Sequence, residues 1–332
     1  MPLLRINATT QGLQLHDRPQ PAETALASHR ETPGPAIVMV HGYKYAPGDV
    51  NHCPHDKIFA AKPGSWPTAL GFGAGRAAEG LGIAFGWHAR GSLWQMHRRA
   101  AELGQTLAAL IRHLRTKTPH RPVHVIAHSL GTEIALSALE HLSAHDLDRM
   151  VLLTGASFSS HAQRMLQTPA GLTTEVFNVV SRENDLFDLA FENLVTAPVP
   201  GDTAIGQGID APNVTTVQLD CPRTLSVFTS LRLPVAPPQR RVCHWSTYTR
   251  PGVMALYTKL LRDPEQLPQA HLARLLPETP APRWARFRRS ERQSDALPQR
   301  AISMPSLPLA LRWKTRIMPA APAQGKQNEH AY

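Results

Sequence analysis

The stretch Val123-His-Val-Ile-Ala-His-Ser-Leu-Gly131 decides the fold of this chain. Its first five residues are mostly apolar or β-branched and predict a short buried strand, while the residues after Gly131 (TEIALSALEHL) predict a helix. Ser129 therefore falls at the turn between a strand and a helix. A helix cap is the simpler role for such a serine. However, the small residues Ala127 and Gly131 on both sides of it favour a tight turn that lifts the hydroxyl above the edge of a sheet.

Similar short apolar runs alternate with helical stretches on both sides of this segment. The predicted buried strands are Ala36–Val40, Gly82–Gly86, Val123–Ala127, Arg149–Leu153, Glu175–Val180 and Thr215–Leu219, and Leu3–Asn7 with Gly12–Leu15 are predicted to add an antiparallel edge pair. Apolar residues at steps of three and four predict a helix from about Gly91 to His113, and a further helix opens at Pro251. This alternation is typical of a mostly parallel sheet of about eight strands with helices on both faces.

The segment around Ser129 resembles the nucleophile elbow G-x-S-x-G of the α/β-hydrolase superfamily, with Ala127 in place of the first glycine. The resemblance covers residues 1–264 and implies an α/β-hydrolase fold with chemistry similar to that of serine esterases and lipases. It also implies that the residue after a strand-ending His-Gly pair offers its N–H to an oxyanion. In Ile37-Val-Met-Val-His-Gly-Tyr43 that residue is Tyr43, and its partner would be the Leu130 N–H. The His41 side chain is expected to be structural.

The same resemblance implies the order serine, acid, histidine along the chain. His244 in Arg241-Val-Cys-His-Trp-Ser-Thr-Tyr lies between the last predicted strand and the helix at Pro251, where this fold presents its catalytic base. The acid is expected in Ser181-Arg-Glu-Asn-Asp-Leu-Phe-Asp188, and we predict Asp185. Asp188 and Glu183 are the alternatives. Asp188 is less favoured because its side chain is expected to face solvent or Arg182. The apolar pair Leu186-Phe187 is expected to pack under the sheet edge.

Charge and proline content divide the chain unevenly. The 332 residues include 35 Lys or Arg and 25 Asp or Glu, a net charge of +10. From Glu265 onward there are 11 basic and 5 acidic residues, so this part carries +6 and the preceding 264 residues carry +4. Nine of the 30 prolines also fall in this part, and the apolar periodicity fades. We therefore predict a catalytic domain over residues 1–264 and a basic, disordered tail over 265–332, removable after about Pro268.

The cysteines and the apolar runs bear on the compartment and on cofactors. Three cysteines are too few for a disulfide framework, no run of 18 apolar residues is present, and the first residues do not resemble a secretory signal, so a cytoplasmic protein is expected. Asn51-His-Cys-Pro-His-Asp56 contains zinc-ligand residue types, but no second ligand pair follows at finger-like spacing, so a metal site is not favoured. A Ser-His-Asp triad needs no metal or organic cofactor.

These patterns favour a serine hydrolase that cleaves a carboxylic ester, with an amide or thioester as less favoured substrates. Ser129 would attack the carbonyl carbon, His244 would transfer the proton, Asp185 would orient His244, and the Tyr43 and Leu130 amides would bind the oxyanion. The expected partner is a small ester, with no obligate nucleic acid. The alternative is a non-catalytic binding protein of the same fold whose basic tail contacts nucleic acid or an anionic membrane.

Overall fold

The computed structural model describes residues 2–9, 12–18, 20–30 and 32–287. Within them an eight-stranded sheet runs through the molecule in the order β2-β1-β4-β3-β5-β6-β7-β8, and only β2 is antiparallel to its neighbour. The strands are β1 (Leu3–Thr9), β2 (Gly12–Leu15), β3 (Ala36–Val40), β4 (Leu81–Gly86), β5 (Val123–His128), β6 (Arg149–Leu153), β7 (Glu175–Val180) and β8 (Val214–Gln218). This arrangement confirms the predicted fold class and the antiparallel edge pair.

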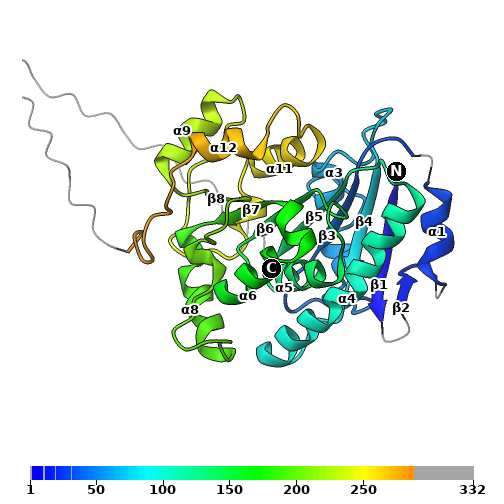
Figure 1. The fold of residues 1–332 in the computed structure, drawn as a ribbon, viewed down its shortest axis with the longest axis horizontal. Helices are drawn as coiled ribbons and strands as arrows, with labels where there is room; N and C mark the ends of the chain where they lie inside the picture. The colour runs from blue at the N-terminus through cyan, green and yellow to red at the C-terminus, as the bar shows by residue number, and fades with distance from the viewer. Residues whose placement is uncertain (1, 10–11, 19, 31, 288–332) are drawn as a thin grey trace, which may run out of the picture. The chain divides into compact units, whose positions relative to one another are not determined.

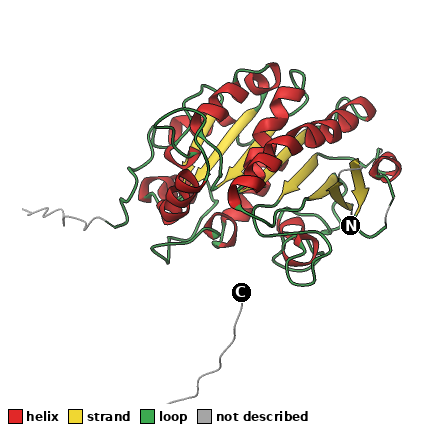
Figure 2. Cartoon of the chain, turned by 90° about the horizontal axis from the view of Figure 1, so that it is seen from below, coloured by secondary structure: helices red, strands yellow, loops and turns green. Residues whose placement is uncertain are grey.

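Helices cover both faces of the sheet (Figures 1 and 2). On one face lie α4 (Leu93–Lys117), α5 (Gly131–Ala138), α6 (Ser159–Leu166), α7 (Pro169–Thr173) and α8 (Asp185–Leu194), and on the other α3 (Trp66–Ala69), α9 (Pro222–Ser230), α11 (Val253–Arg262) and α12 (Gln269–Leu275). The remaining helices are α1 (Ala22–Ser28), α2 (Pro54–Lys57), α10 (Ser246–Thr249) and the 3₁₀ turns η1 (Leu139–His141), η2 (Arg182–Asn184) and η3 (Ile205–Gln207).

Two apolar cores follow from the alternation of side chains along the strands. Val125 of β5 packs with Leu107 and Ile134 in the core on the α4 and α5 face. Its neighbour Ile126 points to the opposite face and packs in the core that contains Leu256 of α11. Because both faces are buried, the central strands are apolar at almost every position, which is why short continuous apolar runs marked them in the sequence.

The packed region extends beyond the predicted boundary at residue 264. Leu267, Leu272 and Leu276 are buried in the α11 core. Gln269 Nε2 donates a hydrogen bond to Thr215 Oγ1 of β8 (2.7 Å). A cut after Pro268 would therefore remove the buried side chains of Leu272 and Leu276, which the expected loss-free truncation did not include. Residues 288–332 of the predicted tail lie outside the described residues.

Within the described part of the chain, no helix combines the length and the apolar character needed to cross a bilayer.

Candidate active site

The turn between β5 and α5 holds Ser129 in a strained conformation. Ser129 has a φ of +54°, in a region that non-glycine residues rarely occupy, as the strained strand-to-helix turn of a nucleophile elbow requires. The turn is packed tightly against the loop after β3. A Cβ at Gly131 would lie 2.6 Å from the His41 carbonyl oxygen, and one at Gly42 would lie 2.7 Å from Ser129 Cβ. Only glycines at these two positions allow the two loops to touch.

The predicted oxyanion donors lie on these two touching loops. Tyr43 follows Gly42 and Leu130 follows Ser129, and neither backbone N–H donates a hydrogen bond to another described residue. The His41 side chain is structural, as predicted. Its Nε2 accepts a hydrogen bond from the Trp87 N–H (3.0 Å) and its Nδ1 bonds to the Gly42 carbonyl oxygen (2.8 Å). These two hydrogen bonds hold the loop that carries Tyr43 in place.

His244 lies beside the elbow, although more than 100 residues separate it from Ser129. Its carbonyl oxygen accepts hydrogen bonds from His128 Nε2 (3.2 Å) and Thr154 Oγ1 (3.3 Å), and the His128 and His244 ring centres are 4.6 Å apart. Burial, and secondarily the neighbouring His128, lower the pKa of His244 well below its ordinary value, so the ring is neutral at pH 7. Between described residues no hydrogen bond joins the Ser129 hydroxyl to His244, a contact that often forms only with substrate.

The side chain that holds the His244 ring is Asn184, which the sequence analysis did not consider. His244 Nδ1 bonds to Asn184 Oδ1 (2.7 Å), and Asn184 Nδ2 donates to Asp188 Oδ1 (2.8 Å). Because Asp188 takes the amide N–H, the amide oxygen faces the histidine and requires a proton on Nδ1. Nε2 is then the basic nitrogen of the ring.

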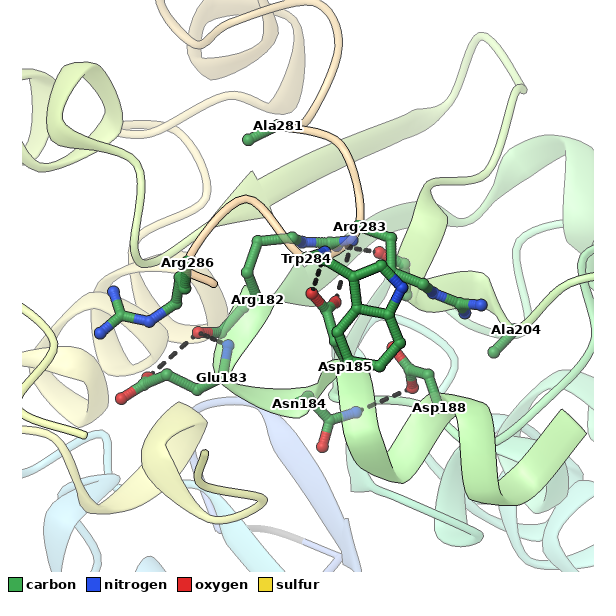
Figure 3. A network of polar contacts seen from close by, with 12 residues as sticks. Arg182, Glu183, Asn184, Asp185, Asp188, Ala204, Ala281, Arg283, Trp284 and Arg286 are labelled. Carbon is green, nitrogen blue, oxygen red and sulfur yellow. Dashed lines mark hydrogen bonds and ion pairs between the residues drawn. The ribbon is translucent and has the colours of Figure 1, made fainter. Parts of the chain in front are cut away.

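Asp185 does not contact His244. One carboxylate oxygen of Asp185 accepts a hydrogen bond from the Trp284 N–H (2.7 Å), and the other lies 3.3 Å from Arg182 Nη1 (Figure 3). Helix α8 begins at Asp185, so Asn184 and Asp188 are one turn apart on a shared face, while Asp185 is rotated about 100° away. An Asn four residues before an Asp was the signal that the sequence contained.

The structure contradicts some of the other predictions for this loop. Glu183 forms a buried ion pair with Arg250. Asp188 is 3% exposed and does not face solvent, but the positive charge of Arg182 acts on its carboxyl group, as the second alternative predicted. Leu186 and Phe187 are 43% and 37% exposed instead of packing under the sheet, and Phe187 stacks on the His244 ring with the ring centres 4.7 Å apart.

Residues 277–287, here called the C-terminal arm, cover the buried acidic groups behind Asn184 (Figure 3). Arg283 donates two hydrogen bonds to Glu192 (2.8 and 2.6 Å), and the Ala281 N–H donates to Gln218 Oε1 (2.6 Å). Arg286 Nη1 lies 3.9 Å from Asp220. Two arginines of the predicted basic tail are therefore used inside the fold to balance carboxylates.

Burial raises the pKa of Asp188 to about 7, against the lowering effect of Arg182 and Arg283. Asp185 and Glu192 add to the rise because their negative charges oppose ionisation of Asp188. The group that fixes the Asn184 amide thus changes charge near neutral pH.

Comparisons with known proteins found one family model and several solved structures that are similar to parts of this chain. A family model described as "Alpha/beta hydrolase of unknown function (DUF900)" matches residues 20–169. No curated protein sequence matches the chain. Among solved structures, the mature lipase BlEst2 of Bacillus licheniformis is similar, with 15% identity, 70% of this chain and 95% of that chain covered, and a TM-score of 0.41. A Trichoderma reesei cutinase in complex with a C11Y4 phosphonate inhibitor is also similar, with 18% identity, 41% of this chain and 61% of that chain covered, and a TM-score of 0.24.

The matched family model, the parallel sheet order and the strained turn at Ser129 lead to one conclusion. The chain has the α/β-hydrolase fold.

Proposed function

We propose that the chain is a serine hydrolase that cleaves a carboxylic ester through an acyl-enzyme on Ser129. The observation that carries the proposal is the hydrogen bond from His244 Nδ1 to Asn184 Oδ1, because it leaves Nε2 basic on a ring that lies beside a strained serine. Histidine oriented by an amide also occurs in the Cys-His-Asn arrangement of other hydrolases. The proposed triad is Ser129, His244 and Asn184, with Asp188 as the group that orients Asn184.

In the proposed acylation step, Ser129 Oγ attacks the ester carbonyl carbon while His244 Nε2 takes the hydroxyl proton. The carbonyl oxygen becomes an oxyanion that accepts hydrogen bonds from the Tyr43 and Leu130 amides, each worth about 3 kcal/mol of transition-state stabilisation. The C–O bond then breaks, and His244 returns its proton to the leaving alkoxide. In deacylation, water gives a proton to His244 and attacks the acyl carbon, and the acid product leaves as Ser129 Oγ regains the proton.

An exposed apolar rim supports an ester with an apolar acyl group. The rim consists of Leu186, Phe187 and Trp245, which are 43%, 37% and 48% exposed. Phe187 contacts both the His244 ring and Trp245, whose ring centre is 6.2 Å away. Exposed aromatic groups next to a reactive histidine offer a surface on which an acyl chain can leave water.

A fluorophosphonate probe and a series of p-nitrophenyl esters of increasing chain length test the proposal. We expect labelling of the wild type, and Ser129→Ala should lose labelling and about 10⁶-fold in kcat while keeping its melting temperature. The matched control is Ser246→Ala, since this buried hydroxyl near His244 has no hydrogen-bond partner among the described residues. A folded wild type that neither takes the probe nor turns over any ester would overturn the proposal and favour the binding protein considered above.

A further inference from the structure

A second cluster of reactive side chains lies at the edge of the sheet, around the Asn51–Asp56 segment. His16 follows edge strand β2, Cys53 precedes α2, and Asp56 lies in the first turn of α2. One ligand atom from each of these three residues lies within 4.8 Å of the other two. Cys53 and Asp56 come from the motif that the sequence singled out, but His16 is 37 residues away from Cys53, so only the fold adds the third group.

The separation of two of these atoms matches the geometry of a tetrahedral zinc ion. Zn–S bonds of about 2.3 Å and Zn–N bonds of about 2.0–2.1 Å at the tetrahedral angle place sulfur and nitrogen about 3.6 Å apart. Cys53 Sγ and His16 Nε2 are 3.7 Å apart. Cys53 is 1% exposed, so its side chain is already held in place by the surrounding core. The separation of these two atoms therefore already matches that of two ligands of one ion.

The third group can reach the same point. The Asp56 side chain is 63% exposed and free to rotate, and its present partner is Arg5, whose Nη1 lies 3.7 Å from Asp56 Oδ1. Arg5 also forms an ion pair with Asp17, so it keeps a carboxylate partner if Asp56 turns toward the ion. A thiolate, an imidazole and a carboxylate together favour zinc over magnesium or calcium, which prefer oxygen ligands only.

Asn7 and His55 lie behind the His16 ring. Asn7 Nδ2 lies 3.3 Å from His16 Nδ1, and Asn7 Oδ1 lies 2.7 Å from His55 Nε2. His55 stacks on His16 with the ring centres 4.1 Å apart, and its Nδ1 is buried without a partner among the described residues. Rotation of the Asn7 amide by 180° lets its oxygen accept the His16 Nδ1–H, which leaves Nε2 free to bind the metal.

We propose that His16, Cys53 and Asp56 form a zinc site with a water molecule in the fourth position. Binding removes the Cys53 thiol proton, which passes to the solvent, and the thiolate sulfur, the His16 Nε2 lone pair and an Asp56 oxygen bind the ion. The site ties edge strand β2 to the segment between β3 and α2, which carries Tyr43. It does not depend on the hydrolase proposal, because it shares no residue with the proposed triad.

Titration of chelator-treated full-length protein with zinc, against a chromogenic competitor, tests the site. We expect one zinc per chain, and one cobalt per chain with the thiolate-to-cobalt charge-transfer absorption that only a cysteine ligand produces. Cys53→Ser should weaken zinc binding more than about 100-fold and abolish that absorption, and Asn7→Ala should weaken binding about 10- to 100-fold. Asp56→Asn, a change at an exposed side chain, keeps the test decisive if Cys53→Ser does not fold.

Two residues outside the proposed site provide matched controls. His52 lies in the same segment, but its Nδ1 bonds to Asp49 (3.1 Å), and Cys221 is a free cysteine on the other side of the sheet order, next to β8. His52→Gln and Cys221→Ser should leave zinc and cobalt binding unchanged. The site is excluded if the wild type binds no stoichiometric zinc, or if Asp56→Asn and Cys53→Ser bind it as tightly as the wild type. In that case Cys53 and His16 form only a thiol-imidazole hydrogen bond.

Discussion

The elbow around Ser129 and the loop that holds His244 are built in opposite ways. The elbow is neutral and steric, because Gly42 and Gly131 let two loops touch and so hold Ser129 at a positive φ. The histidine-holding loop is ionic and buried, because Asp185, Asp188 and Glu192 are balanced by Arg182 and by Arg283 of the C-terminal arm. The position of the proposed nucleophile, Ser129, should therefore be insensitive to pH and to the C-terminal arm, while the orientation of the proposed base, His244, should depend on both.

The largest effect separates Asn184 from Asp185. Asn184→Leu removes the acceptor of the His244 Nδ1–H, so kcat should fall about 10³- to 10⁴-fold near neutral pH. Asp185→Asn keeps an acceptor for the Trp284 N–H and should cost less than about tenfold. Steady-state kinetics of both variants, with fluorophosphonate labelling as a check that Ser129 is still accessible, decide between them. If Asp185→Asn is the more damaged variant, Asn184 is not the residue that orients the base.

The next effect is the pH dependence that Asp188 imposes. Its pKa is raised to about 7, so below that pH it gains a proton, can donate to the Asn184 oxygen, and no longer forces that oxygen toward His244. kcat should therefore fall as the pH drops through about 7, although His244 itself stays neutral there. In Asp188→Asn this fall of kcat at acid pH, the acid limb, should disappear. The kcat itself should be about 10- to 100-fold lower, since either end of the new amide can face Asn184. An unchanged limb in this variant would refute the role of Asp188.

Asp188 also makes the stability of the folded chain depend on pH. The pKa of Asp188 is raised in the folded state, so the folded chain binds this proton more tightly than the unfolded chain does. The stability that Asp188 contributes is present in acid and is lost as the pH rises from about 4 to about 7. In denaturant unfolding across this range, the free energy of unfolding of the wild type minus that of Asp188→Asn should decline as the pH rises.

A smaller effect tests the C-terminal arm. Arg283→Met leaves Glu192 partly buried without its cation, which should cost about 1–3 kcal/mol of unfolding free energy. Loss of the positive charge also removes one of the two groups that lower the pKa of Asp188, so the acid limb of kcat should move to higher pH. Arg286→Met is the control, because Arg286 faces Asp220 at 3.9 Å. Equal pH profiles for the two variants would argue against coupling through Arg283.

The smallest effect concerns the apolar rim. Trp245→Ala removes an exposed ring 6.0 Å from the His244 ring centre, so KM for a long-chain p-nitrophenyl ester should rise by about tenfold or less. The KM for the acetate ester, and kcat for both esters, should remain those of the wild type. Leu194→Ala, at the far end of α8 and 61% exposed, should change neither substrate's KM. A uniform loss across all chain lengths would show that Trp245 supports the fold and does not contact the acyl chain.

The local sequence was sufficient to predict most of the fold and part of the candidate site. The central strands are short continuous apolar runs because the sheet is buried on both faces, and Ala36–Val40, Arg149–Leu153 and Glu175–Val180 were predicted with the observed bounds. The turn at Ser129 could be predicted because the small residues that it requires lie within nine consecutive residues of the sequence. His244 was placed by its position between the last strand and the helix after Pro251.

Tertiary structure alone decided which side chain meets His244, what covers the buried acids, and which group joins Cys53. Choosing Asn184 over Asp185 required knowing where α8 begins, since a shift of one residue turns a side chain by about 100°. The sequence did not reveal the C-terminal arm because Arg283 lies 91 residues from Glu192 along the chain. Likewise, His16 and Cys53 are 37 residues apart. Periodicity reports contacts made within one element, whereas the pairing of charged groups across elements depends on burial, and burial exists only in the folded chain.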